Sequence, residues 1–288
     1  MRIENRICAD FIEMWLSHFH WDALGSRINW FRPYLCVVEQ VSKAKQSIFR
    51  RLADKKFRLE SGLCVAEGLK CIEECIKMGW NPEWVAVDSL QAERIEGWGS
   101  NRFPVYLLPE SGLSFLEHPM GVVAVFPIPK PPPLPVSGPV VVLDGLQDPG
   151  NLGTILRTCH WFGIPDVFLL KGTVDPFSPK AMQSSMGSIA AVNVHRLDLD
   201  LLSDWMSSTG VELWVAQVDG TSVLEMPKVP NRTLGWIIGN EGNGVRPEVA
   251  DLGKSVSVPF FSVKLPPESL NAATALAVLL GQHFLVKD

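Results

Sequence analysis

Apolar runs in the second half of the chain alternate with stretches whose apolar residues recur at helical spacing. The runs are five to eight residues long, which is the usual length of a buried strand. They lie at 140–145, 166–170, 190–197, 212–217, 235–239 and 255–260. The helical stretches lie at 150–162, 179–187, 199–208 and 269–286. This alternation predicts an α/β fold with a mostly parallel sheet that helices cover on both faces.

A similar but shorter alternation precedes a proline-rich segment. Strand-like runs at 63–68, 84–88, 104–108 and 121–127, with helical stretches ending near 77, 95 and 118, predict a small α/β domain. Residues 127–139 then include seven prolines, which fix φ and lack amide donors, so they predict a stiff spacer. The expected organisation is an irregular extension over 1–37, a small domain over 38–126, a linker over 127–138 and a larger domain over 139–288.

Charge changes this picture at one place. The chain of 288 residues has a formal net charge of −5, whereas enzymes that act on nucleic acids are more often basic. Residues 41–60 nevertheless contain seven positive and two negative side chains, and Ser42 is placed to cap a helix there. A solvated helix face is one explanation, and contact with phosphates is the other. The residues expected to contact RNA are Arg50, Arg51, Lys55, Lys56 and Arg58.

The six cysteines indicate a reducing compartment. They include no CxxC pair, and Cys71 and Cys75 would share one helical face, which is more typical of buried small residues than of metal ligands. The chain also lacks a recognisable signal peptide and an apolar run of membrane-spanning length. A cytoplasmic protein without a metal site or membrane span is therefore expected. The aromatic-rich residues 1–37 show no clear period and are interpreted as a docking arm or as a misassigned start.

Three segments of the larger domain place polar residues where strands end. They are LDGLQDPGNLGTILRT (143–158), IIGNEGNGV (237–245) and PPESLNAATALAVLLG (266–281). Ligands of open α/β sheets bind at the carboxyl ends of strands. In the first and third segments Asn151 and Ser269 are placed to cap helices. The side chains expected to meet at this edge are Asn151, Arg157, Glu241, Ser269 and Asn271.

Each segment is ambiguous by itself. The glycines of GNEGNG (239–244) have GxxGxG spacing, the reverse of a dinucleotide fingerprint, and no acidic residue follows at the required distance. A plain tight turn is the alternative. Asn151 and Arg157 are six residues apart and do not share a face of one regular helix, so they converge only if Asn151 lies in the preceding turn. Arg157 alone is also compatible with a surface ion pair.

Together, the three segments closely resemble the SpoU (TrmH) family of RNA ribose 2′-O-methyltransferases, in the SPOUT class. The matching residues are Asn151 with Arg157, Gly239–Glu241–Gly244 and Ser269–Leu270–Asn271. The resemblance implies a homodimer and S-adenosylmethionine bound in a deep trefoil knot at the C-terminal end. It places Gly239, Val258, Leu270 and Ala216 in the cofactor site. Residues 41–126 more weakly resemble the ribosomal-protein-like RNA-binding domain of many members.

The sequence departs from the family pattern at two places. Gln183 stands where members often have an arginine before a Ser-x-Gly, so one phosphate contact is missing. The segment between Pro259 and Ser269 is a few residues longer than usual, which bears on the assignment of Val258. His160, after Arg157, is interpreted as a packed or hydrogen-bonded residue rather than a base.

The resemblance implies methyl transfer to a ribose 2′-hydroxyl, with ribosomal RNA as the expected substrate. A guanidinium does not act as a base at ordinary pH, so Arg157 is expected to hold a phosphate and to stabilise the developing alkoxide. Asn151 and Glu241 would orient Arg157 or the ribose, and Ser269 and Asn271 would shape the pocket. The alternatives are a transfer-RNA substrate and an RNA-binding protein without catalysis. A nicotinamide-dependent oxidoreductase is disfavoured by the glycine spacing.

Overall fold

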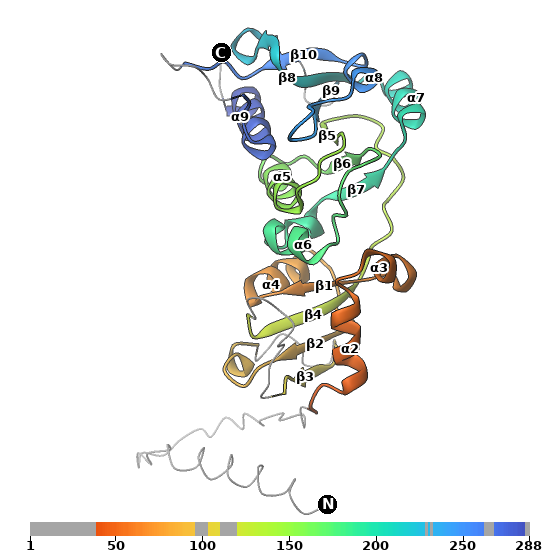
Figure 1. The fold of residues 1–288 in the computed structure, drawn as a ribbon, viewed down its shortest axis with the longest axis vertical. Coiled ribbons are helices and arrows are strands. Elements are labelled where there is room, and N and C mark those ends of the chain that lie inside the picture. The colour runs from red at the N-terminus through yellow and green to blue at the C-terminus, as the bar shows by residue number, and fades with distance from the viewer. Residues whose placement is uncertain are drawn as a thin grey trace, which may run out of the picture. The chain divides into compact units, whose positions relative to one another are not determined.

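The computed structural model describes residues 39–95, 103–109, 120–227, 230, 233–261 and 268–285 (Figure 1). The extension expected over 1–37 and the short helix expected over 110–118 lie outside the described residues. Among the helices that are described, none combines the length and the apolar character needed to cross a membrane.

The larger sheet has six strands, all parallel to their neighbours, in the order β10-β8-β9-β5-β6-β7. Its strands are β5 (Val140–Leu143), β6 (Asp166–Leu169), β7 (Asn193–Arg196), β8 (Glu212–Ser222), β9 (Leu234–Ile238) and β10 (Lys254–Ser257). Side chains of β5 alternate between two hydrophobic cores, with Val141 and Leu143 in one and Val140 and Val142 in the other. The strands are therefore buried on both faces, as the continuous apolar runs predicted.

Helices cover both faces of this sheet. The core that contains Val141 includes residues of α5 (Pro149–Trp161), α6 (Pro179–Ser185) and α9 (Ala272–Leu285), together with the short helices η2 (Ser188–Ala191) and η3 (Val223–Glu225). The core on the other face includes residues of α7 (Leu199–Thr209) and α8 (Pro247–Ala250). Figure 1 shows α5 and α9 side by side, and the ring of Phe162, the C-cap of α5, stacks on that of Phe284 in α9 with centroids 5.8 Å apart.

The smaller sheet has the order β1-β4-β2-β3 and is mixed. Its strands are β1 (Leu63–Glu67), β2 (Trp84–Val87), β3 (Val105–Leu107) and β4 (Val122–Pro127), and η1 (Ala92–Ile95) lies between β2 and β3. The helix α4 (Leu69–Lys77) packs on one face. On the other face are two helices, α2 (Lys43–Arg51) and α3 (Lys55–Ser61), which divide the basic stretch 41–60.

Two caps explain the break between α2 and α3. The Ser42 hydroxyl accepts a hydrogen bond from the amide of Lys45, as the sequence predicted for the first helix. The Asp54 carboxylate accepts one from the amide of Phe57 at 2.9 Å and starts a second helix. An aspartate in extended conformation competes with helix continuation because its side chain satisfies the free amides of a new first turn.

The two sheets share one hydrophobic core on the α4 side. Cys71 and Cys75 are buried there, as predicted, and their thiols lie 3.5 Å from the Met182 carbonyl and 4.0 Å from the Gly187 carbonyl. A Cβ at Gly187 would lie 2.7 Å from the Cys71 carbonyl, so only glycine permits this approach. Burial raises the pKa of the nearby Cys64 thiol to about 12, which keeps it protonated.

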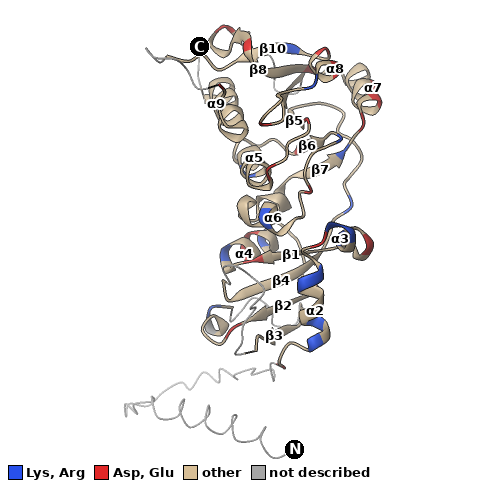
Figure 2. Cartoon of the chain, viewed as in Figure 1, with Lys and Arg blue, Asp and Glu red and all other residues tan. Residues whose placement is uncertain are grey.

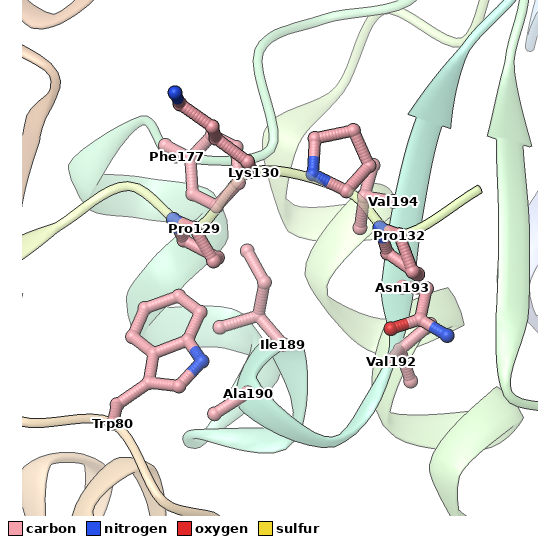
Figure 3. A pocket seen from close by; sticks show the side chains of 11 residues that line it. Trp80, Pro129, Lys130, Pro132, Phe177, Ile189, Ala190, Val192, Asn193 and Val194 are labelled. Atoms are coloured by element: carbon pink, nitrogen blue, oxygen red, sulfur yellow. The ribbon is translucent and has the colours of Figure 1, made fainter.

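The proline-rich segment packs against the protein, unlike a free spacer. The indole of Trp205 donates a 2.6 Å hydrogen bond to the carbonyl of Pro135. Further back along the segment, a cavity of about 80 Å³ lies between the prolines and the rings of Trp80 and Phe177 (Figure 3). The segment is therefore held in place on the protein surface.

Candidate active site

The carboxyl ends of β5 and β9 bring two of the three sequence motifs together. Leu143 pairs with Ile238, and the amide of Asp144 donates to the Ile238 carbonyl at 2.8 Å, so Asp144 and Gly239 leave the sheet side by side. A Cβ at Gly239 would overlap the backbone of Gly244 and Val245. The GNEGNG turn thus folds back on its own start, and its glycine spacing serves this close crossing.

Asp144 and Arg246 fix the base of this turn, and neither was singled out from the sequence. The Asp144 carboxylate is 1% exposed and accepts from Arg246 Nε at 2.8 Å, Nη2 at 2.6 Å and the main-chain amide at 2.8 Å. Hydrogen bonding to Asp144 raises the pKa of the Arg246 guanidinium. The available signal was an aspartate placed directly after four buried apolar residues, where an unpaired carboxylate is costly.

Glu241 joins the turn to the start of α5. Its carboxylate accepts hydrogen bonds from the amides of Gln147 and Asp148, each at 3.1 Å, and from Asn151 Nδ2 at 2.9 Å. Partial burial opposes ionisation of Glu241, but the bonds from Asn151, Gln147 and Asp148 outweigh it and lower the pKa of the carboxyl. The positive end of the helix dipole favours the same charge state.

The third motif joins through Asn271. Its side-chain amide donates to Asn151 Oδ1 at 2.8 Å, while its own Oδ1 accepts from the amides of Ala273 and Thr274 at 3.0 and 3.2 Å. Asn271 therefore caps α9. The chain Glu241–Asn151–Asn271 links all three motifs by side-chain hydrogen bonds, as their joint occurrence in the sequence suggested.

Two cap predictions were wrong. Asp148, rather than Asn151, caps α5 by accepting from the amide of Gly150 at 2.6 Å. Asn271, rather than Ser269, caps α9, and Ser269 lies exposed two residues before it. In α5 the cap falls on Asp148 because this residue is in extended conformation, from which its carboxylate reaches a free amide of the first turn. Because Asn151 does not cap α5, its side-chain oxygen accepts from the side-chain amide of Asn271, whose own oxygen caps α9.

Arg157 stands apart from this network. It lies in the same helix as Asn151, about 9 Å further along its axis at 1.5 Å per residue. Its side chain is exposed, and within the described residues no hydrogen bond or ion pair holds it. The convergence of Asn151 and Arg157 through a preceding turn is therefore not seen in a single chain. The neighbouring His160 hydrogen-bonds Ser188 Oγ at 3.2 Å, in line with its interpretation as a bonded residue.

Of the four residues expected to line the cofactor site, Ala216 lies in β8, and Gly239, Val258 and Leu270 lie in loops at the same edge of the sheet. The pairing of β10 with β8 shifts from Ser255–Val215 to Val256–Thr221, so the segment that starts at Ala216 arches out of the ladder. Ala216 and Val258 are half-buried against the core, Leu270 is 46% exposed, and Gly239 offers main-chain groups. Apolar side chains beside main-chain donors and acceptors suit the adenine ring and the polar ends of S-adenosylmethionine.

The basic residues of the smaller domain divide into two groups. Lys and Arg residues gather on α2 and α3 (Figure 2), and Arg50, Arg51, Lys55 and Lys56 are exposed there. Arg51 stacks on the Phe57 ring at 3.8 Å, which leaves its edge open to solvent. Arg58 is the exception, because it is 3% exposed and its guanidinium is engaged by protein oxygens. The expectation that Arg58 contacts RNA is therefore corrected.

The fold is similar to those of solved methyltransferase structures. A protein from Porphyromonas gingivalis, described as an RNA methyltransferase of the TrmH family, superposes with a TM-score of 0.74 at 33% identity, over 84% of this chain and 98% of that one. An S-adenosylmethionine-bound rRNA methyltransferase from Sinorhizobium meliloti superposes with a TM-score of 0.73 at 26% identity, over 87% and 98%. The expected SPOUT-type α/β fold is thereby confirmed.

The chain belongs to the SpoU rRNA methylase family, whose model matches residues 138–281. Residues 44–124 match the model of an MRM3-like substrate binding domain. The 23S rRNA (guanosine(2553)-2′-O)-methyltransferase RlmP of Bacillus subtilis is 32% identical over 84% of this chain and 97% of its own length. The expectation of an S-adenosylmethionine-dependent RNA ribose methyltransferase is confirmed.

Proposed function

We propose that this enzyme methylates a ribose 2′-hydroxyl of the large ribosomal RNA, at the site formed by Glu241, Asn151 and Asn271. The observation that carries the proposal is the hydrogen-bonded chain of these side chains, which joins the three motifs at one edge of the sheet. The choice of ribosomal RNA is supported by the relative from Bacillus subtilis and by the substrate binding domain. The buried free thiols support a reducing cytoplasm as its location.

The residues of the site divide into anchors and contacts. When bound, S-adenosylmethionine supplies an electrophilic methyl group on a sulfonium. Glu241 is a poor base because three donors already engage its carboxylate and its pKa is lowered, so it anchors Asn151 and the start of α5. The hydroxyl proton then passes to solvent water at this exposed edge as the oxygen gains the methyl. Arg157 holds the adjoining phosphate and stabilises the developing negative charge on oxygen.

A direct test compares ribose methylation in RNA from a strain that lacks this protein with RNA from the complemented strain. Primer extension at low nucleotide concentration, applied to ribosomal and transfer RNA, would locate the modified position. Loss of one ribosomal methylation is the expected result. A loss confined to transfer RNA would replace the proposed substrate, and calorimetry that detects no S-adenosylmethionine binding would support an RNA-binding protein without catalysis.

Replacement of Glu241 by glutamine is expected to loosen the junction of the three motifs. Glutamine places an amide donor opposite the amide of Gln147 or Asp148, so one hydrogen bond becomes a repulsion. We expect weaker S-adenosylmethionine binding, on the order of tenfold, and a lower melting temperature at neutral pH. Isothermal calorimetry and calorimetric melting would measure both, and unchanged values would contradict the anchoring role.

The pH dependence of the same variant follows from the sign of the Glu241 pKa shift. The folded-state pKa lies below the ordinary value of 4.5, so the charged carboxylate stabilises the fold fully above pH 4.5 and this contribution is lost as the pH falls through the lowered value. The melting-temperature difference between wild type and Glu241→Gln should therefore be present at neutral pH and shrink in strongly acidic buffer. A difference that grew on acidification would contradict this assignment.

We also propose that the enzyme is a homodimer that uses the exposed surface of α5 and α9. Large apolar side chains stand in solvent there, including Trp161 at 84% exposure and Leu285 at 69%. Monomers rarely leave such side chains grouped without a partner. Arg157 lies one helical turn before Trp161 and shares its face. A dimer through this surface would therefore bring Arg157 to the interface, where it could reach the site of the partner.

Replacement of Trp161 by glutamate is expected to shift the protein toward monomer and to lower activity together. Light scattering coupled to gel filtration would report the mass, with Leu90→Glu as a control because Leu90 is equally exposed (84%) but lies in the smaller domain. A monomeric wild-type enzyme, or a dimeric variant with full activity, would argue against this interface.

A further inference from the structure

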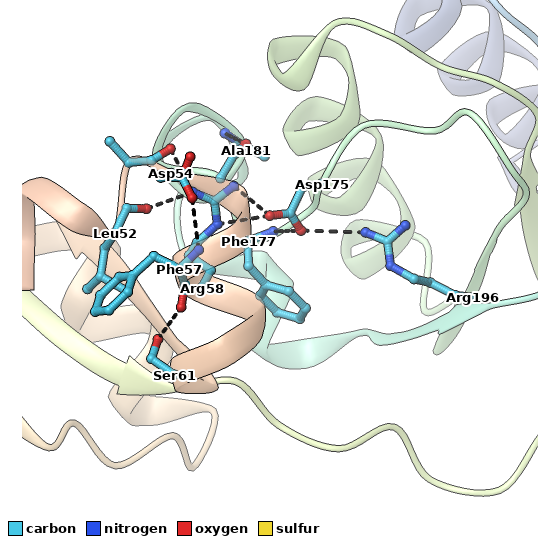
Figure 4. Close-up of polar contacts among 11 residues, drawn as sticks. Leu52, Asp54, Phe57, Arg58, Ser61, Asp175, Phe177, Ala181 and Arg196 are labelled. Carbon is cyan, nitrogen blue, oxygen red and sulfur yellow. Dashed lines mark hydrogen bonds and ion pairs between the residues drawn. The ribbon is translucent and has the colours of Figure 1, made fainter.

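One buried carboxylate joins the substrate binding domain to the methyltransferase domain. Asp175, in the loop after β6, accepts from Arg58 Nε at 2.9 Å and Nη2 at 2.6 Å (Figure 4). The Arg58 side chain is 3% exposed, and its remaining nitrogen donates to the carbonyls of Leu52 and Ala53 at 2.6 and 2.9 Å. All three Arg58 nitrogens are thus engaged by protein oxygens, and Arg58 holds α3 against this loop.

The same carboxylate also faces a second arginine, Arg196, which keeps free donors as far as the described residues show. Arg196 Nη2 lies 3.5 Å from Asp175 Oδ1, on the oxygen that Arg58 leaves open. Two guanidinium groups therefore share one carboxylate, and the cluster has a net charge of +1. The Arg196 side chain is 48% exposed. The surplus positive charge is consequently presented to solvent on a side chain that contacts Asp175 through one nitrogen.

Sheet register places Arg196 at the same edge as the candidate active site. Leu143 pairs with Leu169, and Leu169 pairs with Arg196, so the three residues are level across β5, β6 and β7. Two strand spacings separate Arg196 from the end of β5, or about 10 Å. Asp144, which fixes the GNEGNG turn, follows Leu143 directly.

The loop that carries Asp175 is bonded to the loop that leads into the site. Gln147 Nε2 donates to the Gly172 carbonyl at 2.6 Å, and the amide of Gly145 donates to Thr173 Oγ1 at 3.1 Å. Gln147 is also the residue whose amide holds Glu241. A continuous set of hydrogen bonds therefore runs from Glu241 to the loop of Asp175, and from there to both arginines.

We propose that Arg196 binds a phosphate of the RNA strand next to the methylated nucleotide, with Asp175 as its positioning residue. Because Arg58 of α3 binds the same carboxylate, the phosphate contact of Arg196 lies at a fixed distance from the basic helices α2 and α3. An RNA segment bound by both is therefore held in a fixed position relative to the methyl acceptor. The inference rests on the proposed RNA methyltransferase function. A guanidinium with open donors suits a phosphodiester because its planar fork matches two phosphate oxygens.

The test measures RNA binding and methyl transfer separately for Arg196→Gln. Fluorescence anisotropy with a fragment of 23S rRNA at several salt concentrations should show several-fold weaker binding and a salt slope smaller by about 1, the signature of one lost phosphate contact. Turnover at saturating RNA, S-adenosylmethionine affinity and melting temperature should stay near wild type, so the loss falls on KM. Arg196→Lys should recover part of the affinity because it retains the charge without the fork.

Lys254→Gln is the matched control. Lys254 is exposed and paired with Glu212 at 2.7 Å, but it lies at the opposite, amino edge of the same sheet. Its removal should leave RNA affinity and salt slope unchanged. If both variants weaken RNA binding equally, Arg196 contributes only through the general positive charge of the protein, and the proposal is overturned. Wild-type affinity in Arg196→Gln, or no RNA binding by the wild type, would also overturn it.

The positioning role of Asp175 is tested in a background that removes the buried pair. In the double variant Arg58→Met/Asp175→Leu, adding Arg196→Gln should cost less RNA affinity than it does in the wild type, because Arg196 is no longer directed. An undiminished loss would show that Arg196 acts without Asp175. Absence of methyl transfer to ribosomal RNA by the wild type would overturn the proposed function alone, since the binding measurements stand without it.

Discussion

An Arg157→Ala variant is expected to lose about 100- to 1000-fold in kcat while its fold and its S-adenosylmethionine affinity stay near wild type. A positioned donor that stabilises a developing oxyanion is worth about this much. The Arg157 guanidinium is exposed and has no protein partner among the described residues, so it is available for RNA and its removal leaves no buried group unpaired. Surface changes of this kind alter stability by about 0.5 kcal/mol or less.

Single-turnover methyl transfer to a 23S rRNA fragment would measure this effect, with circular dichroism and calorimetry as checks on fold and cofactor binding. Arg94→Ala is a suitable control, because Arg94 is also exposed and lies in the smaller domain, where within the described residues its side chain bonds Gln91 alone, at 3.1 Å. Full activity in Arg157→Ala would remove Arg157 from the mechanism. If Arg157→Ala loses activity and also has the mass of a monomer in solution, the role of Arg157 is in dimer formation instead.

The strands were predictable because their signal is local. Each of the six apolar runs in the larger domain became a parallel strand, since a run buried on both faces needs no alternation of polar residues. β8 is the instructive exception, because it continues to Ser222 through Asp219 and Gly220 although the apolar run ends near 217. Its pairing with β10 resumes after a shift, and a Cβ at Gly220 would lie 2.6 Å from the Val256 amide, so tertiary contact sets its length.

The site was predictable only as a set of residues. The resemblance brought Asn151, Glu241 and Asn271 to one edge, and the structure adds which atoms bond: amide to carboxylate and amide to amide. Residue roles that depend on distant partners stayed hidden. Asp144 is bonded to Arg246, 102 positions away, and Arg58 to Asp175, 117 positions away. A charge run gives no sign that one of its members is buried, because burial depends on a loop from the other domain.

That buried pair yields the largest expected effect on stability. Asp175→Asn should destabilise the folded protein by about 3–5 kcal/mol, because the buried Arg58 guanidinium loses its counter-charge. The positive charge of Arg196, on the other oxygen of residue 175, is then no longer neutralised either. Folding free energies are typically about 5–15 kcal/mol, so the loss would be a large share of the total. Calorimetric melting or urea unfolding at neutral pH would measure it, and a change below about 1 kcal/mol would contradict the assigned pairing.

Two matched variants separate burial from charge. Lys56→Ala breaks the Lys56–Glu60 pair on the same helix, but those side chains are 84% and 60% exposed, so the cost should stay below about 1 kcal/mol. The double variant Arg58→Met/Asp175→Leu removes both buried charges and should regain much of the stability that Asp175→Asn loses, since apolar side chains of similar size often replace a buried ion pair at little cost. If the double variant is as unstable as Asp175→Asn, the Arg58–Asp175 pair must stabilise the domain junction through its specific hydrogen bonds and not only because the two charges neutralise each other.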